Sequence, residues 1–210
     1  MASQSFEEFA LRISALKSKH RQKLIAIDGG GGAGKSTFAK HLLEYLTHAF
    51  IIHIDDFYKG PWDYRLDHRN YEVNPLFDWD RYNREVLEPI KHEQPVTYHI
   101  YDWKKHTTDT TASVPPDVLV IVEGGFATQK AFSDVYDFKI WIETDTNVRL
   151  ERALKRDGEH MRALWEEDWI PVEKNYFALQ NPASHADIVV LNHSYDFSSG
   201  RFEAISNIGR

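Results

Sequence analysis

Two kinds of apolar pattern alternate along most of this chain. Continuous apolar runs, which are typical of strands buried on both faces of a sheet, occupy 23–28, 50–55, 118–123, 138–143 and 186–191. Segments with apolar residues every three or four positions, which are typical of helices, occupy 5–19, 36–48, 78–92, 147–156 and 161–179. The alternation predicts an α/β domain, a three-layer α/β/α sandwich around a mostly parallel five-stranded sheet.

Two segments depart from this alternation. Residues 96–101 are rich in β-branched and aromatic side chains and predict one strand of a small β-hairpin. Residues 59–74 are irregular, aromatic and charged. Long irregular segments inside α/β domains often contact substrate, so we expect a substrate loop there.

Composition and charge narrow the class of protein. The chain has 210 residues, 42% hydrophobic and 27% charged, which predicts one globular domain spanning 1–210. The net charge of −7 disfavours a protein that binds nucleic acid or an anionic membrane. The lack of cysteine excludes disulfides and thiolate chemistry. No apolar run approaches the roughly 18 residues that span a bilayer, and the polar start does not resemble a signal peptide, so we expect a cytoplasmic protein.

Residues 29–36, which we call the phosphate cradle, read G-G-G-G-A-G-K-S between a predicted strand and a predicted helix. This pattern and context are those of a P-loop, in which backbone amides and a helix N-terminus bind phosphate. Lys35 is expected to contact the β- and γ-phosphates, and the Ser36 hydroxyl to bind Mg²⁺. The predicted nucleotide-binding residues are Gly29, Gly30, Gly31, Gly32, Ala33, Gly34, Lys35, Ser36 and Thr37.

Three acids follow predicted strands at the same edge of the sheet. Glu123 ends the run 118–123, where a carboxylate can reach a metal ion held by the cradle. Asp55 and Asp56 end the run 50–55. Phosphoryl transfer to a hydroxyl needs a carboxylate that accepts the proton or orients the nucleophile. Because side chains alternate along a strand, we expect only one of this pair to face the γ-phosphate.

Five short runs stand in order behind the cradle. They are D-D-F-Y at 55–58, N-Y-E at 70–72, Y-D-W-K-K-H at 101–106, E-G at 123–124, and an arginine-bearing stretch at 143–157. In this order, the runs resemble the uridine kinase-like branch of the P-loop kinases, which also includes phosphoribulokinase and bacterial pantothenate kinase. The resemblance covers residues from about 24 to 191. It implies the P-loop NTPase fold, with ATP and Mg²⁺ as cofactors.

The resemblance also implies a role for each run. Asp55 takes the place of the catalytic carboxylate, and Glu72 takes the place of the acid that binds the ribose hydroxyls. Residues 101–106 match the run that holds the base, with Trp103 in place of phenylalanine. The arginine-bearing stretch opens a lid, whose segment 156–162 is short and lacks the further arginines common in uridine kinases.

The motifs and the resemblance divide the domain into segments and assign candidate residues to catalysis, substrate binding and metal binding. Residues 1–20 are expected to form an N-terminal helix, about 57–110 an acceptor-binding insertion, and about 149–165 the lid. The candidate catalytic residues are Lys35, Asp55, Arg152 and Arg156. The candidate substrate-binding residues are Asp55, Tyr58, Glu72, Tyr101, Trp103, His106 and Arg152, and the candidate metal ligands are Ser36 and Glu123. Four tryptophans match no motif and are expected only to pack: Trp62, Trp79, Trp165 and Trp169.

The sequence therefore predicts an ATP-dependent phosphotransferase acting on a hydroxyl of a small metabolite, with the 5′-hydroxyl of uridine or cytidine as the first candidate. Pantothenate, nicotinamide riboside or a sugar phosphate is an alternative acceptor, and a regulatory P-loop ATPase without acceptor is an alternative function. A GTPase is disfavoured because the guanine-reading N-K-x-D run is absent. We expect a nucleoside-like small molecule as partner, no nucleic acid and no membrane, and leave a homo-oligomer open.

Overall fold

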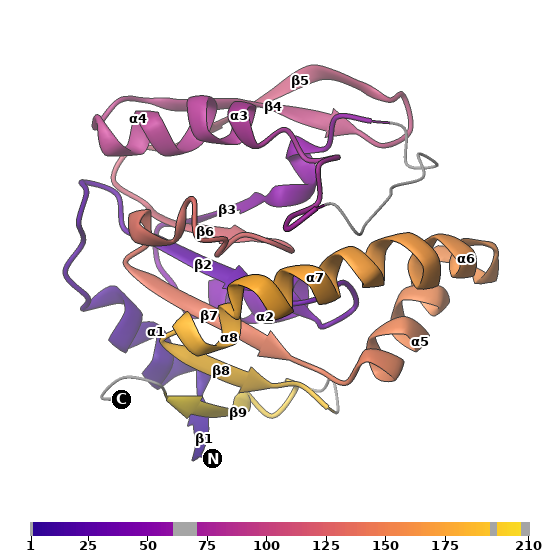
Figure 1. Ribbon diagram of the computed structural model, residues 1–210. Helices are drawn as coiled ribbons and strands as arrows, with labels where there is room; N and C mark the ends of the chain where they lie inside the picture. The colour runs from indigo at the N-terminus through magenta and orange to yellow at the C-terminus, as the bar shows by residue number, and fades with distance from the viewer. Residues whose placement is uncertain (1, 61–70, 194–196, 207–210) are drawn as a thin grey trace.

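The computed structural model describes residues 2–60, 71–193 and 197–206, and a seven-stranded sheet lies at its centre (Figure 1). Five parallel strands are those that the sequence predicts. In spatial order they are β8 (Ile188–Leu191), β7 (Phe138–Glu143), β2 (Leu24–Asp28), β6 (Leu119–Glu123) and β3 (Ala49–His53).

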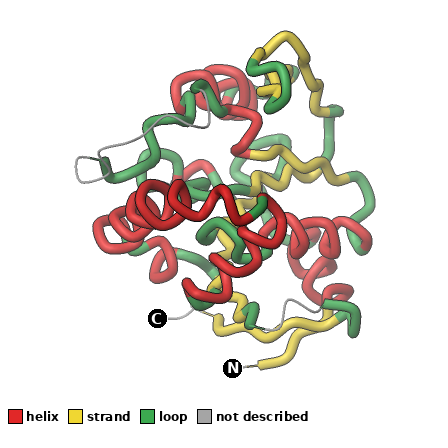
Figure 2. Tube along the Cα trace, turned by 90° about the vertical axis from the view of Figure 1, so that its right-hand side faces the viewer, coloured by secondary structure: helices red, strands yellow, loops and turns green. Residues whose placement is uncertain are grey.

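Two antiparallel strands make the sheet wider than the five strands expected. β9 (Arg201–Ser206) pairs with β8, and β1 (Ala2–Ser5) pairs with β9 at the edge of the sheet (Figure 2). Neither segment is a continuous apolar run, because β1 is polar and β9 alternates between exposed and buried side chains. The pattern that identifies a strand buried on both faces therefore could not find them.

Helices cover both faces of the sheet, as expected. α1 (Phe6–Ser14) and α2 (Lys35–Glu44) pack on the face to which Ile25 and Ile27 of β2 point. α7 (Ile170–Gln180) and the insertion after β3 pack on the opposite face, with Leu24 and Ala26. Because side chains alternate along a strand, successive residues of β2 belong to two separate apolar layers, one on each face of the sheet. The short helix α8 (Pro182–His185) joins α7 to β8.

Both N-terminal helices end earlier than the apolar spacing indicates. The chain beyond α1 is held by Asp137, whose carboxylate accepts hydrogen bonds from the Lys19 N–H at 2.7 Å and the Ser18 hydroxyl at 2.9 Å. Before β3, His48 adopts a φ of 59°, which a continuing helix does not allow. α1 therefore ends at Ser14 and α2 at Glu44, and neither helix could extend through the contacts of Asp137 or through His48 that follow.

The insertion after β3 contains a helical segment and the predicted hairpin (Figure 1). α3 (Trp79–Tyr82), a π-helical turn (Asn83–Leu87) and α4 (Glu88–Lys91) follow one another, so the predicted helix over 78–92 is confirmed. β4 (Val96–Asp102) and β5 (Thr107–Val114) form an antiparallel two-stranded sheet. The Tyr98 ring of β4 stacks on Phe57 with centroids 5.4 Å apart, which attaches the hairpin to the end of β3.

The predicted lid begins on α5 (Thr146–Asp157) and returns through α6 (Arg162–Leu164) and a π-helical turn (Trp165–Trp169) into α7. A small apolar cluster that includes Ala153, Leu154 and Trp165 holds this bend together. Within the described residues, no helix has the length and apolar character that crossing a bilayer requires.

Candidate active site

The phosphate cradle connects β2 to α2, as the sequence predicts. Gly34 precedes α2 with a φ of 96°, a left-handed conformation that glycine adopts at little cost. The first residues of α2 border a cavity of about 970 Å³, which we call the cleft. This volume is within the range of small-molecule sites. The cleft therefore lies at the positive end of α2 and beside the carboxyl ends of the parallel strands, where α/β proteins bind ligands.

The cleft gathers most, but not all, of the candidate residues. Those that line it are Gly31, Gly32, Gly34, Lys35, Ser36, Thr37, Asp55, Tyr58, Trp103, Glu123, Arg152 and Arg156. The candidates that do not line it are Gly29, Gly30, Ala33, Glu72, Tyr101 and His106. Segments that are distant in the sequence, namely the cradle, the end of β3, the hairpin and the lid, thus contribute to one cavity.

Lys35 extends along the inside of the cradle. Its Nζ donates hydrogen bonds to the carbonyl oxygens of Gly29 at 3.0 Å and Gly30 at 2.9 Å. These bonds hold the ammonium group at the mouth of the turn whose amides are expected to bind phosphate. The positive charge of Lys35 acts on both nearby acids: it opposes the rise in the pKa of Asp55 and contributes to the lowered pKa of Glu123.

Ser36 and Glu123 meet at one side of the cleft. The Ser36 hydroxyl donates to Glu123 Oε1 at 2.9 Å, and His53 Nδ1 lies 2.5 Å from the same oxygen. Burial alone would raise the pKa of Glu123, but the hydrogen bond to His53 and the charge of Lys35 outweigh burial and lower it. The hydrogen bond to Glu123 in turn raises the pKa of His53. Glu123 is therefore an ionised acid at neutral pH.

The oxygen atoms of Ser36 and Glu123 fit a Mg²⁺ ion. Mg²⁺ prefers oxygen ligands and takes only one or two from the protein, the others coming from phosphates and water. No group of three or more histidine, aspartate or glutamate side chains is gathered into a metal cage in the part of the chain that the structure describes. The donor set thus suits an ion bound together with a nucleotide.

The adjacent acids Asp55 and Asp56 point to different places. Both belong to a 3₁₀ turn (Ile54–Phe57) that follows β3, rather than to the strand itself. Asp55 lines the cleft, whereas the Asp56 side chain hydrogen-bonds Tyr98 of the hairpin. Asp55 is exposed to the cleft, but the surrounding protein partly desolvates its carboxylate and raises its pKa, and the nearby negative charge of Glu123 adds to this effect. The sequence leaves open which acid faces the cleft, and the turn selects Asp55.

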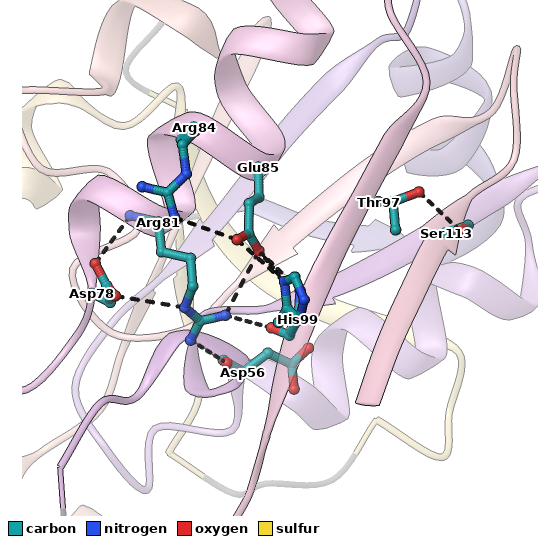
Figure 3. A network of polar contacts seen from close by, with 8 residues as sticks. All are labelled: Asp56, Asp78, Arg81, Arg84, Glu85, Thr97, His99 and Ser113. Carbon is teal, nitrogen blue, oxygen red and sulfur yellow. Dashed lines mark hydrogen bonds and ion pairs between the residues drawn. The ribbon is translucent and has the colours of Figure 1, made fainter. Parts of the chain in front are cut away.

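Arg81 of α3 holds the turn that carries Asp55 (Figure 3). Its guanidinium donates to the carbonyl oxygen of Asp56 at 2.9 Å and to that of His99. It lies 4.8 Å from the Phe57 ring centroid, with carboxylates of Asp78 and Glu85 within 4 Å. Arg81 is only 7% exposed. Because no motif includes it, sequence reasoning did not find this residue.

Replacing Arg81 with Met should destabilise the protein. The substitution removes both carbonyl hydrogen bonds and one of the cations beside the Glu85 carboxylate, which keeps its contacts to the His99 N–H and to Arg84. Losing buried hydrogen bonds from a charged donor costs about 1–3 kcal/mol of unfolding free energy. Denaturant unfolding measures this loss. The exposed neighbour Arg84 is the control, since Arg84→Met should change stability by less than about 0.5 kcal/mol. Equal effects of the two substitutions would contradict the prediction.

The four aromatic candidates form one cluster, of which only part faces the cleft. The Tyr58 and Trp103 rings, 4.5 Å apart, both line the cleft. Tyr101 packs edge-on against Trp103, and its hydroxyl donates to the Gly60 carbonyl and contacts His106 Nδ1 at 2.8 Å. Tyr101 and His106 thus support the wall that Tyr58 and Trp103 present.

Glu72 lies away from the cleft. It is exposed, and its carboxylate accepts a hydrogen bond from Gln180 of α7 at 3.3 Å. Asn74, two residues later, lines the cleft and is 6% exposed. The residue that this segment brings to the acceptor side is therefore an amide, although the sequence motif points to the acid.

The lid contributes arginines and two unexpected tryptophans. Arg152 donates to the carbonyl oxygens of Asn192 and His193, and Arg156 pairs with Asp157 at 2.6 Å. Trp165 and Trp169 were expected only to pack, but both line the cleft, with rings perpendicular and 4.6 Å apart. Helical spacing alone cannot distinguish a packed indole from one that also borders a cavity. Trp79 packs in the core as expected, and Trp62 lies outside the described residues.

Asp28 is a second residue that sequence reasoning missed. It is fully buried at the end of β2, and its carboxylate accepts five hydrogen bonds. The donors are the N–H groups of Gly29, Phe126 and Thr128 and the hydroxyls of Thr128 and Tyr176. Asp28 thus connects the cradle to the loop after β6 and to α7. An acid that directly precedes the glycine run was the available signal.

The substitution Asp28→Asn should destabilise the protein despite its equal size. The new NH₂ group would face backbone N–H donors, so at least one buried donor would lose its partner. An unsatisfied buried group costs about 1–3 kcal/mol, and more where a charged acceptor is lost. Thermal or denaturant unfolding measures the effect. Asp109→Asn on the exposed strand β5 is the matched control and should be neutral. An unchanged stability of Asp28→Asn would show that this carboxylate is not required.

Comparisons with known proteins agree with this geometry. The model of the Phosphoribulokinase / Uridine kinase family matches residues 24–190. A uridine kinase of Streptococcus pyogenes is 30% identical over 179 residues, covering 80% of this chain and 86% of that protein. A uridine kinase of Borrelia duttonii is 27% identical over 177 residues, covering 80% and 85%. A structure described as a possible uridine kinase from Bacillus stearothermophilus has a TM-score of 0.65 at 20% identity, covering 88% of this chain and 96% of that one.

Proposed function

This chain belongs to the phosphoribulokinase/uridine kinase family, and we propose that it transfers the γ-phosphoryl group of ATP to a hydroxyl of a small metabolite. The first candidate for this hydroxyl is the 5′-hydroxyl of uridine or cytidine. The curated relatives named uridine kinase support this choice of acceptor. The observation that carries the proposal is the position of Asp55 in the same cleft as Lys35 and Ser36.

In this proposal, residues of the chain bind the phosphates, orient the acceptor hydroxyl and accept its proton. The cradle amides and Lys35 hold the phosphates, and Asp55 accepts the proton of the acceptor hydroxyl or orients its oxygen. Arg152 and Arg156 stabilise the charge that develops on the transferring group. Residues 149–165 act as the lid that excludes water, and 57–110 act as the acceptor-binding insertion.

Ser36 and Glu123 are the residues that would hold Mg²⁺, since their oxygens already lie 2.9 Å apart at the cradle. A bound Mg²⁺ ion would neutralise charge on the β- and γ-phosphates. On the acceptor side, Trp103, which is 41% exposed and backed by the buried Tyr58 ring, offers an aromatic surface to a planar group, and Asn74 offers an amide.

A panel of acceptors assayed with MgATP tests the proposal. Uridine and cytidine should give acceptor-dependent ADP formation and a phosphorylated product detected by mass spectrometry. Pantothenate, nicotinamide riboside and a sugar phosphate are the matched alternatives. Turnover with one of these but not with uridine would replace the acceptor and keep the kinase. ATP hydrolysis that no acceptor changes would instead favour the regulatory ATPase.

The transfer reaction should lose activity in acid at a higher pH than an ordinary aspartate would cause. Asp55 must be ionised to accept a proton, and partial desolvation by the walls of the cleft together with the charge of Glu123 raises its pKa. Activity is therefore present above this raised pKa and is lost as the pH falls through it. The acid limb of kcat/KM for the acceptor, measured at saturating MgATP, reports the shift. A midpoint at or below the ordinary range for aspartate, about 3.9, would contradict the prediction.

A further inference from the structure

A buried ion pair holds the outer part of the phosphate cradle. Arg149 of α5 and Glu173 of α7 form a salt bridge of 2.7 Å, with side chains only 3% and 9% exposed. Glu173 Oε1 accepts a hydrogen bond of 2.6 Å from the Gly31 N–H. Arg149 Nη1 donates to the Gly31 carbonyl oxygen at 3.0 Å. Both backbone groups of Gly31 are thus engaged by the pair, and a phosphate would have to be bound by other amides of the cradle.

The pair lies so close to the cradle that side chains at 30–32 would collide with it or its surroundings. A Cβ atom on Gly30 would lie 1.9 Å from Arg149 Nη1, and one on Gly32 would lie 2.3 Å from the Arg149 carbonyl oxygen. A Cβ atom on Gly31 would lie 2.5 Å from the Trp165 ring and 3.1 Å from Glu173 Oε1. The P-loop pattern itself requires no glycine at 30, 31 or 32. Contact with α5 and the lid, together with the positive φ of 77° at Gly32, accounts for these additional glycines.

The contact between Arg149 and Gly31 also fixes the positions of the lid arginines along α5. Arg149, Arg152 and Arg156 follow one another along α5 at spacings of three and four residues, which place them along one side of a helix. With a rise of about 1.5 Å per residue, Arg152 and Arg156 lie about 4.5 and 10.5 Å further along the axis. Once Arg149 is fastened to Gly31, the helix therefore sets the distances of both arginines from the cradle.

We propose that Arg149 and Glu173 are positioning residues for phosphate binding, which join the cradle to α5 and α7 so that Arg152 and Arg156 are held in register with the bound phosphates. The proposal rests on the proposed function only in that the cradle binds ATP. It goes beyond the sequence motifs, in which Glu173 has no part. Neither residue needs to contact the nucleotide, since both act through the backbone of Gly31 and through α5.

Two single substitutions distinguish positioning from a simple effect of charge. Arg149→Met removes the donors but keeps an unbranched stem, and the nearly isosteric Glu173→Gln removes the negative charge. If charge alone mattered, Arg149→Met would weaken and Glu173→Gln would tighten the binding of the anionic nucleotide. Positioning predicts that both weaken it, because either change loosens the attachment of Gly31 to α5 and α7.

The binding of MgATP to the full chain is measured by isothermal titration calorimetry without any acceptor. Both variants should raise the Kd of MgATP, Arg149→Met by about 10- to 100-fold. The matched control is the exposed pair Arg21–Asp117, which has the same distance of 2.7 Å and lies outside the cleft and the lid. Arg21→Met and Asp117→Asn should leave the Kd unchanged. If Arg149→Met does not fold, Glu173→Gln carries the test, with thermal unfolding as the check of folding.

A double-mutant cycle separates positioning from a merely structural role. Arg156→Met should weaken MgATP binding in the wild-type background but much less in the Arg149→Met background, because the arginine would already be out of register. The proposal would be overturned if the effects of Arg149→Met and Arg156→Met on the Kd simply multiply in the double variant. It would also be overturned by an unchanged Kd in both Arg149→Met and Glu173→Gln, or by tighter binding in Glu173→Gln. Since no acceptor is present, these outcomes are distinct from a failure to phosphorylate uridine.

Discussion

Replacing Asp55 with Asn is expected to reduce phosphoryl transfer by about 10²- to 10⁴-fold, the usual contribution of a general base. The amide keeps the size of the side chain but cannot accept the proton of the acceptor hydroxyl. MgATP binding should persist, because the cradle, Lys35 and Ser36 are unchanged. The rate of product formation under saturating substrates and the Kd of MgATP together measure this separation.

Asp56→Asn is the matched control for this prediction. Asp56 is adjacent in the same turn, but its side chain hydrogen-bonds Tyr98 and does not line the cleft. Its substitution should change transfer by less than about tenfold, since it acts only through packing of the turn. Transfer that survives in Asp55→Asn but is lost in Asp56→Asn would reverse the assignment. Loss of MgATP binding in Asp55→Asn would remove the case for a base.

The substitution Lys35→Met should have the second largest effect, with a loss of about 10²- to 10³-fold in kcat. The ammonium group is held by the Gly29 and Gly30 carbonyl oxygens at the mouth of the cradle. Met replaces its stem but supplies no charge for the γ-phosphoryl group as negative charge develops in the transition state. We also expect weaker MgATP binding, because the ground state uses the same charge. Steady-state kinetics and calorimetry measure the two effects separately.

Lys40 offers a control for the general effect of positive charge. It lines the same cleft from α2, but it is exposed and lies more than one helical turn beyond Lys35. The substitution Lys40→Met should therefore change kcat only slightly, because exposed charges are screened by water and salt. If both lysine variants lost activity equally, the special position of Lys35 in the cradle would not be supported.

The two halves of the site differ in what can be inferred about their ligands. The phosphate half is made by one continuous motif and a helix N-terminus, and its chemistry follows from the backbone. The proposed acceptor half draws on Tyr58, Asn74 and Trp103, which line the cleft from separate segments. Relatives at 27–30% identity support the family more strongly than they support one acceptor. This is why the acceptor panel is the decisive experiment for substrate specificity.

The features that depend on local pattern could be predicted from the order of the amino acids alone. Five apolar runs alternate with helical segments, which predicts the parallel core, and the cradle motif between β2 and α2 predicts the phosphate site. Glu123 could be placed beside the cradle because parallel strands end at a common edge. These inferences succeed because backbone geometry and burial periodicity act over a few neighbouring residues.

Which side chains face the cleft depends on long-range packing and could not be predicted from local pattern. The 3₁₀ turn directs Asp55 inward and Asp56 toward Tyr98, and the fold places Glu72 outside and Asn74 inside. Pairs such as Arg149–Glu173, separated by 24 residues, meet only after α5 and α7 have packed beside the cradle. No periodicity encodes such contacts, since they depend on how whole elements pack around a shared core. The sequence thus specified the phosphate-binding framework, and long-range packing selected the residues that surround it.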